Sequence, residues 1–516
     1  MNEHIEVRKG TYIDSVALLN ISQRVAEVDG VDAALVAMAT ELNLGFLEPM
    51  GFDASEVAAG PNDLLVAIRA ADEAVLEQAL ARLEGELAST RRGSDADASG
   101  GQFPPRTTAS ALARLEDVEL VLVSTPGEHA AVEAFDALHA GSNVMLFSDN
   151  VPLETEIELK RQAAEAGLLV MGPDCGTALV AGIGLGFANV VRPGGVGVVA
   201  ASGTGAQQLM CLLDDAGVGI SHVLGVGGRD LGAEVGGAAT LMALEALDAD
   251  PDTELVVILS KPPAPEVAER VREAAQRCTT PVVLGLIGPG ADDLTAVSRR
   301  VLDQLGVEAE DPHDWAPLEE PSDEAGQHAY GAGRTAGLSR ARQPRPGAIR
   351  GLFAGGTLCT EAVLLATESF GTVRSNVAPG DLDADSPHLF LDLGEDEFTR
   401  GRPHPMIDNT LRIERIRVAA EDPDVAVLLL DVVLGHGAQP DPAGELGPEI
   451  EAAVSTAEAA GRDLAVVVSL CGSAGDPQGR EGQVRRLREA GASVHLSNAA
   501  AAREAIRLIG TEEAQR

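Results

Sequence analysis

The sequence of 516 residues is poor in aromatic side chains and in lysine. Phe, Trp and Tyr make up only 3% of the chain, which argues against the aromatic platforms on which nucleobases stack. Lysine occurs three times, at Lys9, Lys160 and Lys261, and the remaining cations are arginines. With 38 Lys and Arg against 80 Asp and Glu, the net charge is −42. Nonspecific binding to nucleic acid or to an anionic membrane surface is therefore not expected.

Cysteine and long apolar runs are also scarce. The five cysteines lie far apart and form no Cys-x-x-Cys pair, so neither a zinc site nor a disulfide framework is indicated, and a reduced, cytoplasmic setting fits. No run of about 18 apolar residues occurs, so we expect no transmembrane helix. The start of the sequence, MNEHIEVRKG, lacks the apolar core of a secretory signal.

Short apolar runs alternate with helical stretches along most of the chain, and 57 glycines punctuate them. This pattern predicts parallel sheets covered by helices on both faces. We therefore predict an α/β protein with several Rossmann-like or flavodoxin-like parallel-sheet domains in series, after a small N-terminal α/β domain. Two polar stretches, rich in Gly, Pro and acidic residues, divide the chain into these parts. The predicted parts are the N-terminal domain (1–88), a linker (89–108), two parallel-sheet domains (109–192 and 193–307), a second linker (308–346) and a C-terminal α/β domain (347–516).

Two glycine-rich loops join a predicted strand to a predicted helix. In parallel sheets ligands bind at the carboxyl ends of the strands, where such loops lie. Glycines let backbone N–H groups approach an anion, and the helix N-terminus adds partial positive charge. The candidate phosphate-binding or substrate-binding residues are Ser202, Gly203, Thr204 and Gly205 in the first loop, and Gly355, Gly356 and Thr357 in the second. A tight turn that simply requires glycine accounts equally well for either loop.

Other strand ends carry charged residues. Gly227, Gly228 and Arg229 follow an apolar run and could form a cradle for phosphate or carboxylate, although Arg229 could instead pair with a neighbouring acid at the surface. Lys261 ends another run and could supply a point charge, or lie in a solvated turn. Asp174 could orient a ligand or cap a helix.

The segment GRPHPMID, residues 401–408, places two prolines around His404. Proline fixes the backbone, so this segment could hold Arg402 and His404 in position for chemistry. A buried structural histidine is the alternative interpretation. The histidine spacings match no recognised metal site, so no metal is predicted.

The motifs MGPDCGT, ASGTG, GVGGRDLG, SKPP, GGTLC and GRPHPMID occur in this order. Together with AGPNDL near the start, they resemble the FdrA family over nearly the whole chain. That family is similar to the succinyl-CoA synthetase α-subunit in the central part and to the ligase domain of the β-subunit in the C-terminal part. The resemblance implies a CoA-binding-like Rossmann domain at 109–192 and ligase-like domains at 193–307 and 347–516.

Three departures separate the chain from a synthetase. The stretch that matches the phosphohistidine loop, residues 288–294, contains no histidine. The glycine-rich loop that receives CoA at the start of the synthetase α-subunit has no counterpart before the first central strand. No ATP-grasp domain is evident. The sequence therefore keeps anion-binding loops but lacks the evident parts for nucleotide-driven phosphoryl relay.

The FdrA resemblance implies a subunit of an oxamate carbamoyltransferase in allantoin (purine) catabolism. Such an enzyme joins carbamoyl phosphate and oxamate to give oxalurate and phosphate. The glycine loops and Asp174 would bind substrate, and Arg402, His404 and Lys261 would be catalytic. Partner subunits, small anionic substrates and an oligomer are expected; no cofactor is certain, with CoA as the candidate. The alternatives are an acyl-CoA synthetase acting on a small carboxylate with nucleotide, and a noncatalytic scaffold or ligand-sensing subunit.

Overall fold

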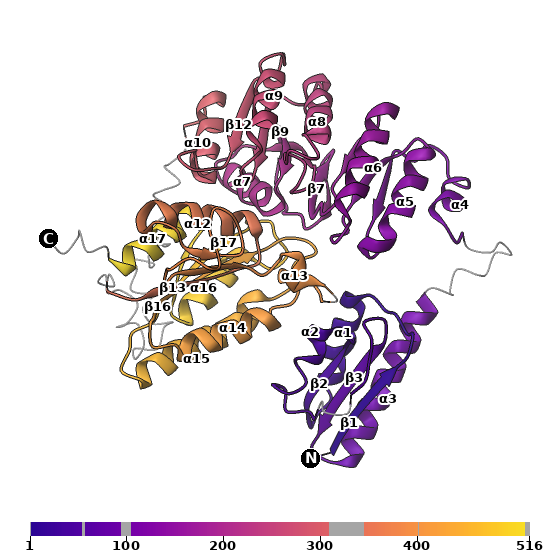
Figure 1. Cartoon of the computed structure of the whole chain (residues 1–516), viewed down its shortest axis with the longest axis vertical. Helices are drawn as coiled ribbons and strands as arrows, with labels where there is room; N and C mark the ends of the chain where they lie inside the picture. Colours follow the sequence, from indigo (N-terminus) through magenta and orange to yellow (C-terminus); the bar gives the residue numbers. More distant parts are fainter. Residues whose placement is uncertain (1, 54–56, 94–104, 309–344, 401, 511–516) are drawn as a thin grey trace. The chain divides into compact units, whose positions relative to one another are not determined.

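The structure is a computed structural model that describes residues 2–53, 57–93, 105–308, 345–400 and 402–510 (Figure 1). The chain forms two compact units. The first consists of Met1–Ala111 and Glu395–His404, and the second of Leu112–Gly394 and Pro405–Arg516. Most of both predicted linkers lies outside the described residues. No helix in the described ranges is long and apolar enough to cross a membrane.

The first unit contains a three-stranded antiparallel sheet in the order β1-β3-β2. Helices α1 and α3 pack on one face of the sheet, where Leu18, Ile68 and Leu83 are buried. This small α/β unit confirms the sequence prediction. Its elements are β1 (Asn2–Arg8), α1 (Ser15–Ala26), β2 (Val31–Met38), α2 (Glu41–Leu44), β3 (Leu64–Ala70) and α3 (Glu73–Gly93).

The second unit begins with a three-stranded parallel sheet in the order β4-β5-β6. Helices α5 and α6 cover one face through small and aliphatic side chains such as Ala134 and Leu159. The elements are α4 (Thr108–Leu112), which spans the boundary between the units, β4 (Leu120–Val123), α5 (Gly127–His139), β5 (Asn143–Leu146), α6 (Leu153–Ala166) and β6 (Val170–Met171).

A six-stranded sheet follows in the order β12-β11-β9-β10-β7-β8. Strands β9 to β12 are parallel, as the sequence predicts, whereas β7 and β8 form an antiparallel hairpin that the apolar pattern did not reveal. The hairpin turns at Ala181 and Gly182, both with positive φ. The elements are β7 (Thr177–Val180), β8 (Ile183–Gly186), β9 (Pro193–Ala201), α7 (Gly203–Asp215), β10 (Ile220–Gly225), α8 (Ala238–Ala249), β11 (Leu255–Ser260), α9 (Pro265–Ala275), β12 (Val282–Leu286) and α10 (Leu294–Leu305).

The C-terminal part forms a second six-stranded sheet, entirely parallel, in the order β14-β15-β13-β16-β17-β18. Helices α12 and α17 lie on one side of this sheet, and α14 and α15 on the other (Figure 1). The elements are β13 (Ala348–Phe353), α12 (Gly356–Phe370), β14 (Arg374–Ser375), β15 (Leu389–Asp392), α14 (Thr410–Glu421), β16 (Val425–Val433), α15 (Pro442–Ala459), β17 (Ala465–Cys471), α16 (Arg480–Glu489), β18 (Ala492–His495) and α17 (Asn498–Ile509), while α13 (Asp396–Thr399) belongs to the first unit.

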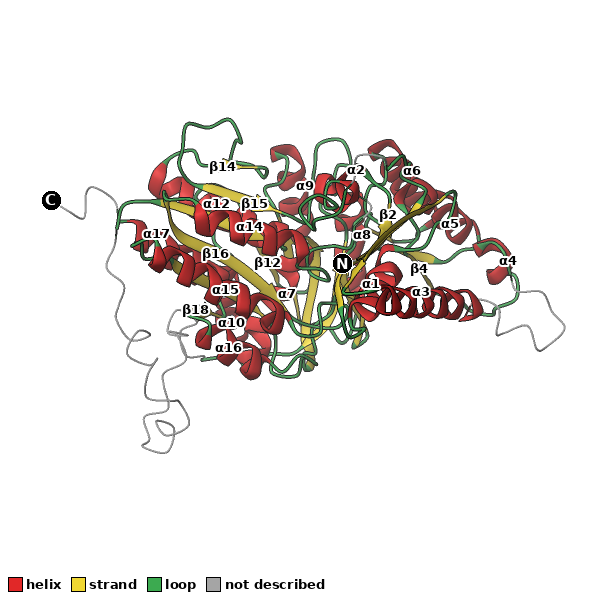
Figure 2. Ribbon diagram, turned by 90° about the horizontal axis from the view of Figure 1, so that it is seen from below, coloured by secondary structure: helices red, strands yellow, loops and turns green. Residues whose placement is uncertain are grey.

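Four helices join the two six-stranded sheets. Helix α7 packs on α10 and α12, and α17 packs on α12 and α10. One continuous apolar cluster includes Val198 and Leu209 from the first sheet region and Leu358 and Val467 from the second. Figure 2 shows the strands with these helices around them. Because α7 follows the internal strand β9 and α12 follows the internal strand β13, this packing determines how their glycine loops meet.

Candidate functional site

The two glycine loops predicted to bind anions meet in the second unit. The hydroxyl oxygens of Ser202 and Thr357 lie 2.6 Å apart and form a hydrogen bond. Ser202 precedes the first residue of α7 and Thr357 lies in the first turn of α12. Both side chains are buried, whereas Gly203 and Gly356, which begin the two helices, are half-buried. Two helix N-termini therefore converge at a point that keeps some access to solvent.

The start of α7 is capped by its own sequence. Ser202 has an extended backbone, and its Oγ accepts a hydrogen bond from the N–H of Gly205 at 3.1 Å. A Cβ on Gly205 would lie 2.2 Å from that oxygen, so only glycine fits there. This cap leaves the other N–H groups of the first turn without an intrahelical acceptor, which is the usual condition of a helix N-terminus.

The start of α12 is built differently. Its N-cap residue is Gly355, which has no side chain to cap the helix. The carboxylate of Asp431, from β16, accepts instead from the N–H groups of Ala354 at 2.8 Å and Gly355 at 2.7 Å. A Cβ on Gly355 would lie 2.9 Å from the side chain of Thr204. Glycine is therefore required at Gly355 for the two loops to approach each other.

Lys261 and Asp392 lie beside the first residue of α12. A Cβ on Gly356 would be 2.9 Å from Lys261 Nζ and 2.4 Å from Asp392 Oδ2. Lys261 follows β11 and Asp392 ends β15, so the two strand ends bring opposite charges to this loop. Asp392 Oδ1 also accepts from the N–H of Gly394 at 2.9 Å. The cation that the sequence singled out at Lys261 thus joins the paired glycine loops.

A second pair of helix N-termini gives a useful comparison. Helices α10 and α17 begin beside the buried carboxylate of Glu361, which accepts from Leu294 N and from Asn498 Nδ2, each at 2.7 Å. Burial, with the nearby charge of Asp293, raises the pKa of Glu361 to about 7. The protein's own carboxylate therefore lies between these two N-termini. At the α7–α12 pair the Ser202 and Thr357 hydroxyls meet instead, with Lys261 alongside.

The Gly227–Arg229 loop and the Asp174 loop form a separate cluster. Gly227 has a φ of +88°, and a Cβ on it would lie 2.5 Å from the carbonyl oxygen of Pro173. Gly228 is exposed. Arg229 Nε binds Glu156 at 2.9 Å and its Nη2 donates to the Val151 carbonyl at 2.8 Å. The Arg229 guanidinium is therefore bound by the protein in this structure, and its role in anion binding stays a prediction.

The acid that holds Arg229 belongs to a buried charge cluster. Lys160 Nζ binds Glu156 and Asp230, each at 2.8 Å, and donates to the Val226 carbonyl at 2.9 Å. These side chains fix the loop after β10 to helix α6. Thr177, just beyond Asp174, lies near the α7 start, because a Cβ on Gly203 would be 3.5 Å from its Oγ1.

Arg402 and His404, the other predicted catalytic residues, belong to the first unit. The Arg402 guanidinium lies 3.7 Å from the centre of the Phe46 ring, and Arg402 Nε donates to Asn43 Oδ1 at 3.1 Å. His404 is half-buried. The structure thus shows a cation–π contact for Arg402, and the catalytic roles of both residues stay predictions.

Sequence reasoning assigned no role to Asp392 or to Arg412, although both contribute to the α12 start. Asp392 ends an apolar strand at the carboxyl edge of a parallel sheet, and that position is the signal that could have identified it. Arg412 lies in a polar helical stretch, and its sequence carries no such signal. Its side chain is nevertheless buried and forms an ion pair with Asp431 at 2.8 Å.

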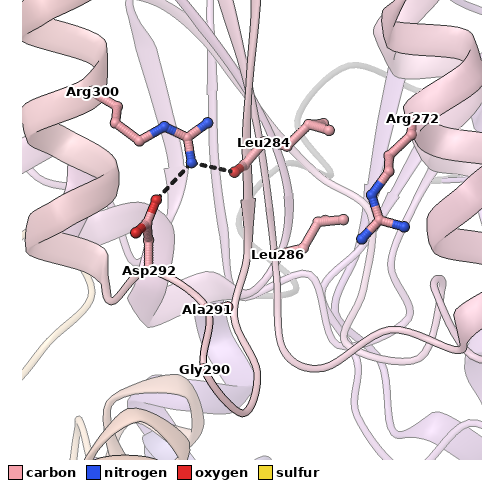
Figure 3. Close-up of a pocket in the computed structure, with 7 residues that line it drawn as sticks. All are labelled: Arg272, Leu284, Leu286, Gly290, Ala291, Asp292 and Arg300. Atoms are coloured by element: carbon pink, nitrogen blue, oxygen red, sulfur yellow. Dashed lines mark hydrogen bonds and ion pairs between the residues drawn. The ribbon is translucent and has the colours of Figure 1, made fainter.

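A pocket of about 350 Å³ lies beside β12, the edge strand of the first six-stranded sheet (Figure 3). Arg300 Nη1 binds Asp292 at 2.7 Å and the Leu284 carbonyl at 3.3 Å, so it covers part of the strand edge. Arg272 lies on the other side of Leu284 and Leu286 (Figure 3). Charged side chains at a strand edge protect it against pairing with other chains.

Comparison with known families covers most of the chain. Residues 1–103 match an AllF heavy metal-associated domain, residues 191–285 match a CoA binding domain, and residues 352–508 match a CoA-ligase domain. The CoA-binding match lies almost entirely within residues 193–307. The FdrA resemblance implied a ligase-like domain there and placed the CoA-binding-like domain at 109–192.

The described side chains of the first unit do not fit a heavy metal. The sequence has no cysteine before Cys175, so residues 1–103 offer no thiolate. In the β1–α1 loop, Lys9 Nζ and the Gly10 N–H both bind the Asp63 carboxylate, at 3.0 and 2.8 Å. These bonds and that of Gly60 N–H lower the pKa of Asp63 to about 2. Among all described residues, no group of three or more His, Cys, Asp and Glu could hold a metal ion.

One relative places the chain in a family, and two others match part of it. The protein YahF of Escherichia coli K12 is 40% identical over 506 residues, which cover 95% of both chains. The succinate–CoA ligase α-subunit of Methanothermobacter thermautotrophicus is 26% identical over 34% of this chain and 59% of its own length. The malate–CoA ligase α-subunit of Methylorubrum extorquens is 28% identical over 31% and 56%. This chain therefore belongs to the YahF family, an FdrA-like family with an acid–CoA ligase-like enzyme fold in the succinyl-CoA ligase α-subunit superfamily.

Proposed function

We propose that this chain is an enzyme of the acid–CoA ligase type that binds the phosphate of a small acyl phosphate where α7 and α12 begin. The observation that carries the proposal is the hydrogen bond of 2.6 Å between Ser202 and Thr357, which brings two glycine-rich helix N-termini together. Lys261 adds a cation at the same place. The two helix N-termini and Lys261 each favour an anion, and they lie together in a protein that is otherwise strongly acidic.

The proposed reaction is the exchange of an acyl group between phosphate and CoA. The CoA thiolate attacks the carbonyl carbon of the acyl phosphate, a C–S bond forms, and the C–O bond to phosphate breaks. The thiol proton goes to solvent, and phosphate leaves with the electron pair of the broken bond. The first-turn N–H groups of α7 and α12 and the Lys261 ammonium would stabilise the charge that develops on the leaving phosphate.

The substrate class follows from the relatives and from the loops. The ligase relatives are named for succinate, malate and sulfoacetate, all small anions, and we propose the same class here. The loop of residues 288–294 contains no histidine that could carry a phosphoryl group. We therefore propose that the acyl phosphate is bound ready-made and is not formed on this chain through a phosphohistidine.

Carbamoyl transfer from carbamoyl phosphate to oxamate is the second candidate. One observation favours it: the Asp392 carboxylate, an acceptor, lies beside Gly356 among groups that donate. An acceptor at that place suits a substrate that carries an N–H group next to its phosphate, as carbamoyl phosphate does. In this reaction the oxamate nitrogen attacks the carbamoyl carbon, the C–O bond to phosphate breaks, and a proton leaves the nitrogen.

A third interpretation is a scaffold or ligand-sensing subunit whose partner chains hold the catalytic groups. Partner subunits and an oligomer stay predictions. This interpretation differs from the other two in one respect: the chain would bind phosphate or a small carboxylate, and substitutions at Ser202 would leave turnover of the assembled enzyme unchanged.

The test is turnover by the full-length protein, alone and with co-purified partner chains. Succinyl phosphate with CoA should give succinyl-CoA and phosphate if the first candidate holds, whereas carbamoyl phosphate with oxamate should release phosphate if the second does. S202A should lower the turnover rate, in whichever of the two assays the wild type is active, at least tenfold, since it removes a group that shapes the phosphate site. S221A is the matched control, because Ser221 forms a similar buried hydroxyl pair with Thr253 at 2.8 Å. Equal rates for S202A and S221A would contradict the catalytic assignment.

A further inference from the structure

A buried ion pair lies at the start of α12. Asp431 is fully buried near the end of β16, and Arg412, from α14, is 2% exposed. Arg412 Nη1 binds Asp431 Oδ1 at 2.8 Å and also donates to the main-chain oxygen of Asp431. Arg412 Nη2 donates to Asn409 Oδ1 at 2.8 Å. The guanidinium is thus fixed by three hydrogen bonds in a place that excludes water.

Asp431 holds the backbone that leads into α12. Its two carboxylate oxygens accept from the N–H groups of Ala354 and Gly355, the two residues before the helix. The N–H groups of Gly356 and Thr357 begin the helix, and Asp431 does not take them. The ion pair therefore orients the first turn of α12 without occupying the groups that would bind a ligand.

Stability alone does not explain this pair. Burial raises the pKa of Asp431 and lowers the pKa of Arg412, so the surroundings oppose both charges. Buried ion pairs of this kind can often be replaced by apolar side chains without loss of stability. A lone negative charge on Asp431 would also repel an anion at the α12 start, and Arg412 cancels it.

We infer that Arg412 and Asp431 are a positioning pair for the phosphate site. Asp431 fixes Ala354 and Gly355 so that the first turn of α12 faces the ligand, and Arg412 keeps the site attractive to anions by neutralising Asp431. The inference rests on the proposed function, because it concerns the same anion site. It adds two residues that touch neither substrate nor reacting atoms.

The test measures, by calorimetry, the affinity of full-length variants for inorganic phosphate. Thermal unfolding of each variant without phosphate shows whether the variant folds. R412Q leaves Asp431 without its counter-charge and should weaken phosphate binding on the order of tenfold. R412K keeps the charge and should bind within about threefold of the wild type. The double variant R412Q/D431N removes the uncompensated charge but also replaces one of the two oxygens that hold Ala354 and Gly355, so it should recover only part of the loss. R417Q is the control, because Arg417 lies on the same helix in an exposed pair with Glu449.

The outcomes separate the inference from the proposed function. If the wild type binds no phosphate, the proposed site is wrong. If the wild type binds and folded R412Q binds equally well, only the positioning pair is overturned. A structural role alone would lower the thermal stability of R412Q/D431N without restoring any affinity, so a folded double variant that binds phosphate no better than R412Q also contradicts the inference. If R412Q does not fold, the phosphate affinity of R412Q/D431N is compared with that of the wild type. Weaker binding by the double variant supports the inference, and equal binding overturns it.

Discussion

Glu361 provides a quantitative test of how the helices around the site are held. Its carboxylate is fully buried between the starts of α10 and α17 and accepts from Leu294 N and Asn498 Nδ2. Burial raises its pKa from 4.5 to about 7. The folded protein therefore binds this proton more tightly than the unfolded chain, so the stabilisation is present at low pH and is lost as the pH rises through about 7.

The magnitude follows from the two pKa values. At about pH 5.5 the proton on Glu361 should stabilise the folded state by roughly 2 kcal/mol. At about pH 8 this stabilisation should be lost. E361Q removes the titration while keeping the size of the side chain.

The assay is urea unfolding of the wild type and E361Q at these two pH values. The quantity of interest is the change with pH in the difference between the two unfolding free energies, because the many other titrating groups cancel in it. E361Q should lose less stability than the wild type on going to high pH, by about 2 kcal/mol. Parallel pH profiles would refute the reasoning, since they would mean that Glu361 titrates alike in the folded and unfolded states.

Three further predictions concern other buried positions. G355A should abolish phosphate binding measured by calorimetry, because its Cβ would lie 2.9 Å from Thr204; unchanged affinity would contradict the close approach of the loops. K160M should destabilise the protein by about 3–5 kcal/mol in urea unfolding, since it leaves buried Asp230 without its cation while Glu156 keeps Arg229, whereas exposed R417Q should cost about 0–1 kcal/mol. Burial and the nearby Arg350 lower the pKa of His388 to about 4, so its contribution to stability should be lost as the pH falls from about 6.5 towards 4; an NMR titration of His388 with a midpoint near 6.5 would contradict this.

Much of the fold could be predicted from local patterns. Nearly continuous apolar runs such as those of β11 and β16 indicate parallel sheets, because both faces of such strands are buried. The hairpin of β7 and β8 escaped prediction, because each strand has only four residues and the second, IGLG, contains two glycines and is partly exposed. Pairing of this kind depends on the neighbouring strand β10, which lies some forty residues further along the chain.

The candidate site was predictable in its parts but not in its assembly. Each glycine loop could be recognised from glycines between a strand and a helix. That Ser202 meets Thr357 depends on the packing of α7 against α12, 155 residues apart in the sequence, which no local pattern encodes. The same limit applies to Arg229, whose partner Glu156 lies 73 residues away. Local sequence identifies charged residues near a loop, and only the tertiary structure shows which of them are bound by the protein.

We propose that the starts of α7 and α12 form one phosphate site. Its most direct test is a crystal structure of the full-length protein with arsenate, a phosphate analogue whose anomalous scattering marks its position. We expect a peak within hydrogen-bond reach of the backbone N–H groups of Gly203 and Gly356 and of Lys261 Nζ. A peak only at another place, such as the Gly227–Arg229 loop, or no peak between the two helices at concentrations that support binding in solution, would contradict it.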